Sequence, residues 1–125
     1  MFFSSSKIFA VSGALLCLFA VLLGAFGAHA LKDLLEQNAR LDTFELANRY
    51  QFFHGLALLI ISGRYDFVAT FEKLIGFCIL VGVIVFSGSL YVLSISNFTW
   101  LGAVTPIGGL LLILGWGTLA VKEWR

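Results

Sequence analysis

Long apolar stretches alternate with short polar ones along the chain, and the apolar stretches have the length of membrane-spanning helices. No charged residue occurs between Ile8 and Leu31, whereas about 20 helical residues cross the hydrocarbon core of a bilayer. The pattern predicts spans over residues 8–30, 43–63, 74–95 and 105–121. We therefore expect an all-α fold, a bundle of four transmembrane helices that forms a single membrane domain over residues 1–125.

The end of the first apolar stretch allows two interpretations. Ala28-His29-Ala30 matches the A-x-A pattern of a signal-peptide cleavage site. However, the apolar region of a cleavable signal is only about 7–15 residues long, and the stretch here is longer. Ala20, Gly24 and Ala28 recur every four positions, a spacing that lets two membrane helices approach closely. We therefore expect the first span to be retained and to pack through this face.

Local signals predict where the later helices begin. Asp42 and Glu45 have the spacing of a capping box, which predicts that the second helix begins at Thr43. Thr105 and Pro106 resemble an N-cap followed by proline in the first turn, which predicts the start of the fourth helix. Glycines recur at six-residue intervals in the third span and favour close contacts between helices. They are Gly76, Gly82 and Gly88.

The polar stretch after the first span contains leucines near helical spacing, at Leu31, Leu34, Leu35 and Leu41. This spacing predicts a short amphipathic segment in the membrane interface between spans one and two. Glu45 and Arg49 follow, four residues apart, so we expect them to form an ion pair on the first turns of the second helix.

The basic residues predict the orientation of the chain. Four spans place both termini and the turn over residues 64–73 on one side of the membrane. That side holds five basic residues and the other side holds three. Since cytoplasmic loops carry an excess of Lys and Arg, we expect cytoplasmic termini. The five are Lys7, Arg64, Lys73, Lys122 and Arg125, and the three are Lys32, Arg40 and Arg49.

Composition supports a membrane protein and excludes other classes. Hydrophobic residues make up 60% of the chain and charged residues 12%, against about 45–50% and 25% in soluble domains. The net charge of +1 provides no basic surface for nucleic acid. Cys17 and Cys78 stand alone in apolar stretches and fit small packing residues. The lipid bilayer is therefore the first partner that we expect.

Four phrases, taken together, resemble a known family. They are GAFGAHAL at 24–31, YQFFHGLALL at 50–59, FSGSLYVLS at 86–94 and TPIGGLLLILGW at 105–116. In their order and spacing they resemble the family called domain of unknown function 423, whose eukaryotic relatives are similar to transmembrane protein 256. The resemblance implies a small four-span membrane protein, in the bacterial inner membrane or, in the eukaryotic branch, in mitochondria. It implies no activity.

The resemblance also marks the residues that belong to the family's motifs. They are Gly24, Gly27, His29, Tyr50, Gln51, His54, Ser87, Gly88, Ser89, Tyr91, Thr105, Pro106, Gly108, Gly109 and Trp116. We interpret most of them as structural. In particular, serines at 87 and 89 usually bond the preceding turn of their own helix, and the glycine pair at 108 and 109 favours close helix packing.

Three of the motif residues are candidates for a site. His29 ends the first span, and His54 lies in the second span four residues after Tyr50. We expect the three to form one polar cluster near the non-cytoplasmic face. An imidazole there can bond across helices, ligate haem, bind a metal or contact a lipid headgroup. Hydrogen bonding between helices is the favoured interpretation, with no bound cofactor or metal.

No pair of side chains inside the spans is placed to act as general acid and base, so we expect the protein not to be an enzyme. The leading interpretation is a structural or accessory subunit that packs with a membrane partner or with itself. The first alternative is a binder of a small molecule, lipid or cofactor, such as haem or quinone, that uses the histidine cluster. The second is permeation of a small solute or ion by an oligomer.

Overall fold

The computed structural model describes residues 4–125, so the first three residues of the predicted domain lie outside the described part of the chain. The described residues form, in chain order, α1 (Ser5–Ala28), α2 (Lys32–Gln37), α3 (Leu41–Arg64), α4 (Thr70–Ser96), the 3-10 helix η1 (Thr99–Ala103) and α5 (Thr105–Trp124). No strand occurs among residues 4–125, and the predicted all-α class is confirmed.

Three helical segments are long and apolar enough to cross a membrane. They are α1, α4 and the segment Thr99–Trp124, which joins η1 to α5. These segments correspond to the first, third and fourth predicted spans. α3 is as long as α1 but carries more polar side chains, and it is not among the segments found in residues 4–125.

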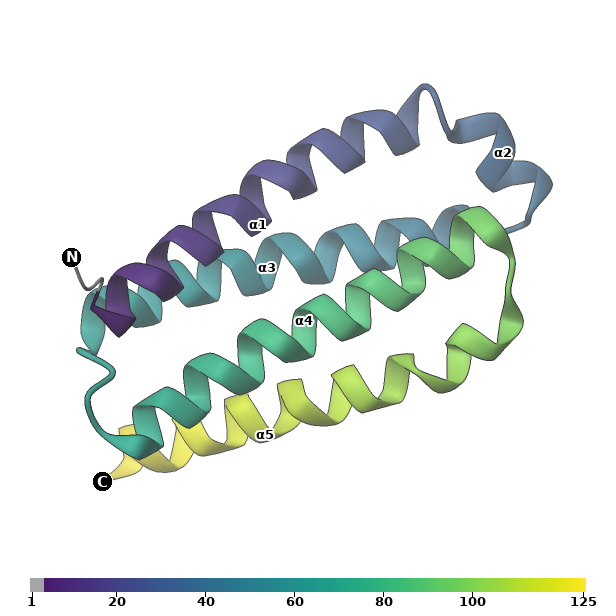
Figure 1. Cartoon of the computed structure of the whole chain (residues 1–125). Helices are drawn as coiled ribbons and strands as arrows, with labels where there is room; N and C mark the ends of the chain where they lie inside the picture. Colours follow the sequence, from purple (N-terminus) through teal and green to yellow (C-terminus); the bar gives the residue numbers. More distant parts are fainter. Residues whose placement is uncertain (1–3) are drawn as a thin grey trace.

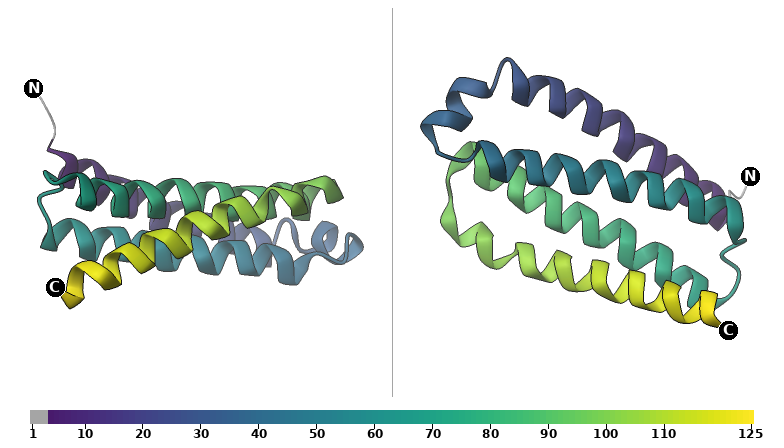
Figure 2. Two further views of the ribbon diagram at one scale, coloured as in Figure 1. Left: turned by 90° about the horizontal axis from the view of Figure 1, so that it is seen from below. Right: turned by 180° about the vertical axis from the view of Figure 1, so that it is seen from behind.

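The four long helices lie side by side in the order α1, α3, α4 and α5 (Figures 1 and 2). Each packs on its neighbour in this row, and within the described chain the α5 backbone lies close to α4 and η1 only. Side chains of α5 reach α3, as in the Arg64–Glu123 salt bridge. The expected bundle is therefore an open row. The start of α1 and the end of α5 lie at one end of the row, and α2 and η1 lie at the other (Figure 1).

The helix ends differ in part from the sequence signals. α3 begins at Leu41, and Asp42 lies inside its first turn without capping it, so the predicted capping box and the start at Thr43 are wrong. Pro106 lies in the first turn of α5 as expected, but the N-cap is Val104 and not Thr105. η1 ends at Ala103, directly before the α5 N-cap, and the α5 N-terminus has no side-chain cap.

α1 packs against α3 through a face that includes part of the predicted one. Its buried residues are Gly13, Ala20 and Gly27, which are seven positions apart, the repeat of a left-handed coiled coil. A Cβ atom at Gly13 would lie 2.6 Å from the Gly55 carbonyl oxygen, so the two backbones approach closely. Of the expected four-residue repeat, Ala20 is buried and Gly24 lies against Asn48, whereas Ala28 is exposed. The expected packing face is therefore confirmed at Ala20 and Gly24 and wrong at Ala28.

Candidate functional site

Polar side chains of α3 meet α1 and α4 in the middle of the row. Asn48 Nδ2 donates to the Ala20 carbonyl oxygen at 2.7 Å and to the Tyr91 hydroxyl oxygen at 3.1 Å. Tyr91 donates to Gln51 Oε1 at 2.6 Å, and Gln51 Nε2 donates to the Leu16 carbonyl oxygen at 2.9 Å. These bonds join three helices and pair groups that would be costly to leave unpaired in an apolar interior.

Sequence reasoning singled out Gln51 and Tyr91 but missed Asn48. Asn48 precedes Gln51 by three residues, so the two side chains lie on one face of α3. The pair of amide side chains one helical turn apart is the signal that could have identified Asn48. Amide side chains in apolar helices commonly form hydrogen bonds to a neighbouring helix.

The motif at 87–89 connects α4 to both of its neighbours. Ser87 Oγ donates to the Ala47 carbonyl oxygen of α3 at 2.8 Å, so the expectation that it bonds its own helix is wrong. Ser89 does donate to a carbonyl of its own helix, at 3.0 Å, and its hydroxyl also lies 2.7 Å from that of Thr105 on α5. The serines therefore hold helices together and do not face an ion site.

The glycines of the motifs differ in what surrounds them. A Cβ atom at Gly108 would lie 2.8 Å from the Gly82 carbonyl oxygen, and one at Gly24 would lie 3.1 Å from Asn48 Oδ1. The close packing expected for the glycine pair is therefore confirmed at Gly108. At Gly109 a Cβ atom would meet only the Phe86 ring, at 3.8 Å, so the expectation is wrong there. At Gly88 a Cβ atom would have no neighbour within 4 Å, so the expected close contact there is wrong.

His54 uses both ring nitrogens within the protein. Nδ1 lies 2.7 Å from the Tyr50 carbonyl oxygen, and Nε2 lies 3.0 Å from Trp116 Nε1. The indole N–H is a donor only, so Nε2 accepts, and the proton of the neutral imidazole sits on Nδ1, which donates to the carbonyl. In this arrangement neither nitrogen is free to ligate haem iron or a metal ion.

The rings of His54, Tyr50 and Trp116 lie together between α3 and α5. Tyr50 stacks on His54 with ring centroids 5.6 Å apart and packs on Phe86 of α4 at 4.5 Å. They line a largely apolar groove of about 960 Å³, called here the α3–α5 groove. The remaining lining residues are Phe53, Gly109, Leu112, Ile113 and Gly117.

His29 does not join this group. α1 runs antiparallel to α3, with Cys17 Sγ 3.7 Å from the Phe52 carbonyl oxygen and with Gly27 against the Phe44 ring. His54 is thus level with Cys17, and His29 lies 12 residues further along α1, about 18 Å away. His29 is exposed at the C-cap of α1. The predicted three-residue cluster is therefore wrong, because α3 begins early and carries His54 deep into the row.

Charged side chains gather at the ends of the helices. The salt bridges formed within residues 4–125 join Arg64 to Glu123 at 2.8 Å and Lys122 to Glu72 at 3.0 Å, at the end that holds the start of α1 and the end of α5. The expected Glu45–Arg49 ion pair is not among them, so that prediction is wrong. No group of three His, Cys, Asp or Glu residues in the described chain is placed to hold a metal ion.

Comparison with known proteins gives a consistent result. A sequence model of a family described as "Protein of unknown function (DUF423)" matches residues 23–109. A UPF0382 membrane protein of Staphylococcus aureus is 42% identical over 119 residues, which are 95% of this chain and 97% of that protein. A UPF0382 membrane protein of Bacillus subtilis is 35% identical over 117 residues, which are 92% and 94% of the two chains. No solved structure is matched.

Proposed function

The chain belongs to the DUF423 family of membrane proteins, and we propose that it is a four-span accessory subunit that binds a helix of a partner membrane protein. The role is not catalytic. The observation that carries the proposal is the α3–α5 groove, because the open row leaves an apolar, aromatic surface of α3, α4 and α5 uncovered by the chain's own helices.

In this proposal α3 is the second span although it is less apolar than α1, α4 and α5. It has 24 residues, or about 36 Å of helix, against a hydrocarbon core of roughly 30 Å. Asn48 and Gln51 bond to α1 and α4, so their amides do not require water. The neighbouring helices also cover both sides of α3 in the row.

We place α2 in the membrane interface as the amphipathic segment. Leu35 is fully buried against the protein, while Leu34 is 37% exposed and Lys32 faces outward. Asn38, which follows the helix, donates to the Ser94 carbonyl oxygen at 3.0 Å. This bond fixes α2 to the end of α4, at the level where η1 also lies (Figure 1).

We also place the protein in the bacterial cytoplasmic membrane with cytoplasmic termini. The similar proteins are membrane proteins of bacteria. The excess of basic residues lies at the end of the row that carries the start of α1 and the end of α5, and positive loops stay in the cytoplasm.

The shape of the groove favours a helix as its occupant. A Cβ atom at Gly117 would have no neighbour within 4 Å, and one at Gly109 would meet only the Phe86 ring, at 3.8 Å. Small residues let a second backbone approach closely. A glycine in a helix costs about 1 kcal/mol relative to alanine, and a packed partner would offset that cost. Trp116 is 44% exposed and offers an aromatic anchor.

Filling the groove tests the proposal. Gly109→Trp places a ring in the groove, and Leu114→Trp is the matched control, because Leu114 is 58% exposed on the same helix but does not line the groove. After mild detergent extraction from the native membrane, we expect a membrane protein to co-purify with the wild type and with Leu114→Trp but not with Gly109→Trp. A photocrosslinker at Ile113 should capture the same protein.

Equal recovery of that protein with all three chains would contradict the proposal. So would the absence of any co-purifying membrane protein at near-stoichiometric amount. A native mass measurement of the same preparation shows whether the partner is a second copy of the chain or a different protein.

A small-molecule binder is the second candidate. The groove volume of about 960 Å³ falls within the range of roughly 300–1,000 Å³ for such sites, and Tyr50, Phe53 and Trp116 provide the flat surfaces that a quinone ring requires. An absorption spectrum and a solvent extract of the purified protein separate the two candidates. A stoichiometric chromophore would favour the binder. Permeation is less supported, because the large exposed side chains of α1, α4 and α5 are apolar.

A further inference from the structure

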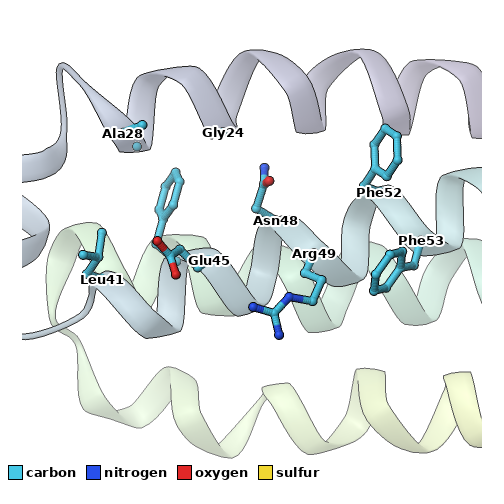
Figure 3. Close-up of a pocket in the computed structure, with 10 residues that line it drawn as sticks. Gly24, Ala28, Leu41, Glu45, Asn48, Arg49, Phe52 and Phe53 are labelled. Atoms are coloured by element: carbon cyan, nitrogen blue, oxygen red, sulfur yellow. The ribbon is translucent and has the colours of Figure 1, made fainter.

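A second groove lies between α1 and α3, nearer to the end of the row that holds α2. Its volume is about 440 Å³, and its lining combines Glu45, Asn48 and Arg49 with Phe52 and Phe53. Figure 3 shows Asn48 and Phe52 directed toward α1, whereas Arg49 and Phe53 extend from the other side of α3, with the guanidinium toward the Leu41 end. This groove shares Phe53 with the α3–α5 groove and has no other lining residue in common with it.

The two charged side chains of this groove have no salt-bridge partner in the described chain. Glu45 and Arg49 are both exposed, and the salt bridges of residues 4–125 involve other residues. Asn48 does not supply the missing counter-charge, because its amide N–H groups are already directed to the Ala20 carbonyl and to Tyr91. A charge inside a membrane span requires a partner or a path to the headgroup region.

Arg49 lies deeper along α3 than Glu45, measured from the start of the helix. Arg49 lies eight residues after the start of α3 at Leu41, or about 12 Å, and Glu45 lies four residues after it, or about 6 Å. Helical side chains tilt toward the helix N-terminus, and arginine reaches toward the interface with its long stem. The guanidinium is therefore directed toward the headgroup region, with the Glu45 carboxylate nearer to the start of α3.

We propose that the α1–α3 groove binds the headgroup of a zwitterionic aminophospholipid from the leaflet on the α2 side. In a phosphoethanolamine headgroup the phosphate lies deeper and the ammonium lies further out. In this order the Arg49 guanidinium donates to the phosphate and the Glu45 carboxylate accepts from the ammonium. Both are charge-assisted hydrogen bonds. An anionic lipid without an amine would bring its phosphate close to the Glu45 carboxylate and leave that charge unpaired.

The apolar part of the groove suits the acyl chains of the same lipid. Phe52 and Phe53 follow Arg49 toward the middle of the span. On the α1 side the groove is lined by Gly24, Gly27 and Ala28, where Asn48 lies against Gly24 and the Phe44 ring lies against Gly27. The inference rests on α3 crossing the membrane, as proposed above, and does not depend on a partner in the α3–α5 groove.

Lipid selectivity measured by native mass spectrometry tests this inference. The purified full chain is equilibrated in micelles with equal amounts of phosphatidylethanolamine, phosphatidylglycerol and phosphatidylcholine that carry the same acyl chains. We expect the wild type to retain phosphatidylethanolamine in preference to the other two. Arg49→Gln should lower this retention by about tenfold, as for the loss of a charge-assisted hydrogen bond, whereas Arg49→Lys should keep most of it.

The variant Glu45→Gln tests the proposed contact with the lipid ammonium group independently of Arg49. It should abolish the preference for phosphatidylethanolamine over phosphatidylglycerol without lowering total lipid retention. Lys32→Gln is the matched control, because Lys32 is an exposed basic residue at the same end of the row but outside the groove. Gly109→Trp should also leave lipid retention unchanged, which separates this site from the partner groove.

Three outcomes would overturn the inference. The first is phosphatidylethanolamine retention by Arg49→Gln equal to that by Lys32→Gln. The second is a wild type that holds the three lipids equally. The third is a preference for phosphatidylglycerol that Glu45→Gln does not change, which would indicate a simple anion site. Loss of the four-span arrangement is detected separately, by reporter fusions at the two chain ends.

Discussion

At the scale of single residues, His54 shows how packing fixes the chemistry of a side chain. A histidine between two membrane helices can act as a ligand, as a proton carrier or as a structural link. Here the indole N–H of Trp116 and the Tyr50 carbonyl oxygen take both nitrogens. The side chain is therefore held as one neutral tautomer, and its main effect is to connect α5 to α3.

This link predicts a stability effect for Trp116→Phe. The substitution keeps a ring in the groove but leaves His54 Nε2 without its donor. We expect the free energy of unfolding to fall by about 1 kcal/mol, since polar bonds between membrane helices contribute about 0.6 kcal/mol on average and at most about 2. A denaturant titration of the protein in mixed micelles measures this change in the free energy of unfolding. Trp124→Phe is the control, because Trp124 is 92% exposed, and an equal loss in both variants would contradict the link.

The bonds between Asn48, Gln51 and Tyr91 predict energetic coupling. Tyr91→Phe removes the hydroxyl that donates to Gln51 and accepts from Asn48. We expect Tyr91→Phe and Gln51→Leu each to cost about 1 kcal/mol of stability, and the double variant to cost less than the sum by about 0.5–1.5 kcal/mol. Additive effects in the double-mutant cycle would show that the residues act separately. Tyr65→Phe, in the α3–α4 connection, is the matched control.

At the scale of elements, the contact between α4 and α5 depends on glycine. A Cβ atom at Gly108 would lie 2.8 Å from both the Phe86 Cα atom and the Gly82 carbonyl oxygen. Both are backbone atoms, which cannot move aside as a side chain would. The two helices must therefore separate if position 108 carries any side chain.

Two alanine substitutions test this contact. Gly108→Ala should lower the melting temperature in detergent, with a stability loss of about 1–3 kcal/mol that reflects overpacking. Gly88→Ala should leave stability unchanged or raise it by up to about 1 kcal/mol, because a Cβ atom at that position has no neighbour within 4 Å and alanine is the better helix former. A similar melting temperature for the two variants would contradict the packing described here.

The elements could be predicted from the sequence to different extents. The apolar stretches predicted α1, α4 and α5 well, because membrane helices are recognised by length and composition alone. α3 was predicted as a helix, but its start was wrong because Leu41 begins the helix without a side-chain cap. The packing face of α1 is predicted correctly at Ala20 and Gly24. It is wrong at Ala28, because the seven-residue repeat of Gly13, Ala20 and Gly27 places the contact with α3 at Gly27.

The candidate site could be predicted only in part. Tyr50 and His54 lie on one helix at four-residue spacing, so their proximity follows from helix geometry. The bond from Trp116 to His54 joins residues 62 positions apart, and nothing in the local sequence indicates it. His29 was misplaced for a related reason, because its level relative to His54 depends on the register between α1 and α3.

At the scale of the whole molecule, the open row divides the helices by role. α3 and α4 lie inside the row, and half of the α4 span is buried. α1 and α5 at the two ends bury only 17% of their spans and present mostly apolar side chains outward. The molecule therefore presents long apolar flanks on both sides of the α3–α5 and α1–α3 grooves described above.

The positions of the two chain ends relative to the membrane depend on both the number of spans and their orientation. Four spans place the two chain ends on the same side of the membrane, whereas three spans, with α3 outside the hydrocarbon core, would place them on opposite sides. The basic residues near the chain ends and the α3–α4 connection outnumber those near α2 by five to three, and this margin favours the cytoplasm for both ends. Arg64 and Lys122 count fully although they pair with Glu123 and Glu72, because acidic residues contribute little to orientation.

Reporter fusions distinguish these arrangements. We expect green fluorescent protein to fluoresce when fused before the chain or after Arg125, and alkaline phosphatase to be active only when inserted near Asn38, between α2 and α3. Fluorescence at one end together with phosphatase activity at the other would show three spans and exclude α3 as a transmembrane helix. Phosphatase activity at both ends would keep the four spans and reverse the orientation. Because the margin is two charges, we expect Lys7→Gln with Lys73→Gln to weaken the preference for cytoplasmic chain ends measurably. Replacing Lys32 and Arg40 by Gln should strengthen that preference.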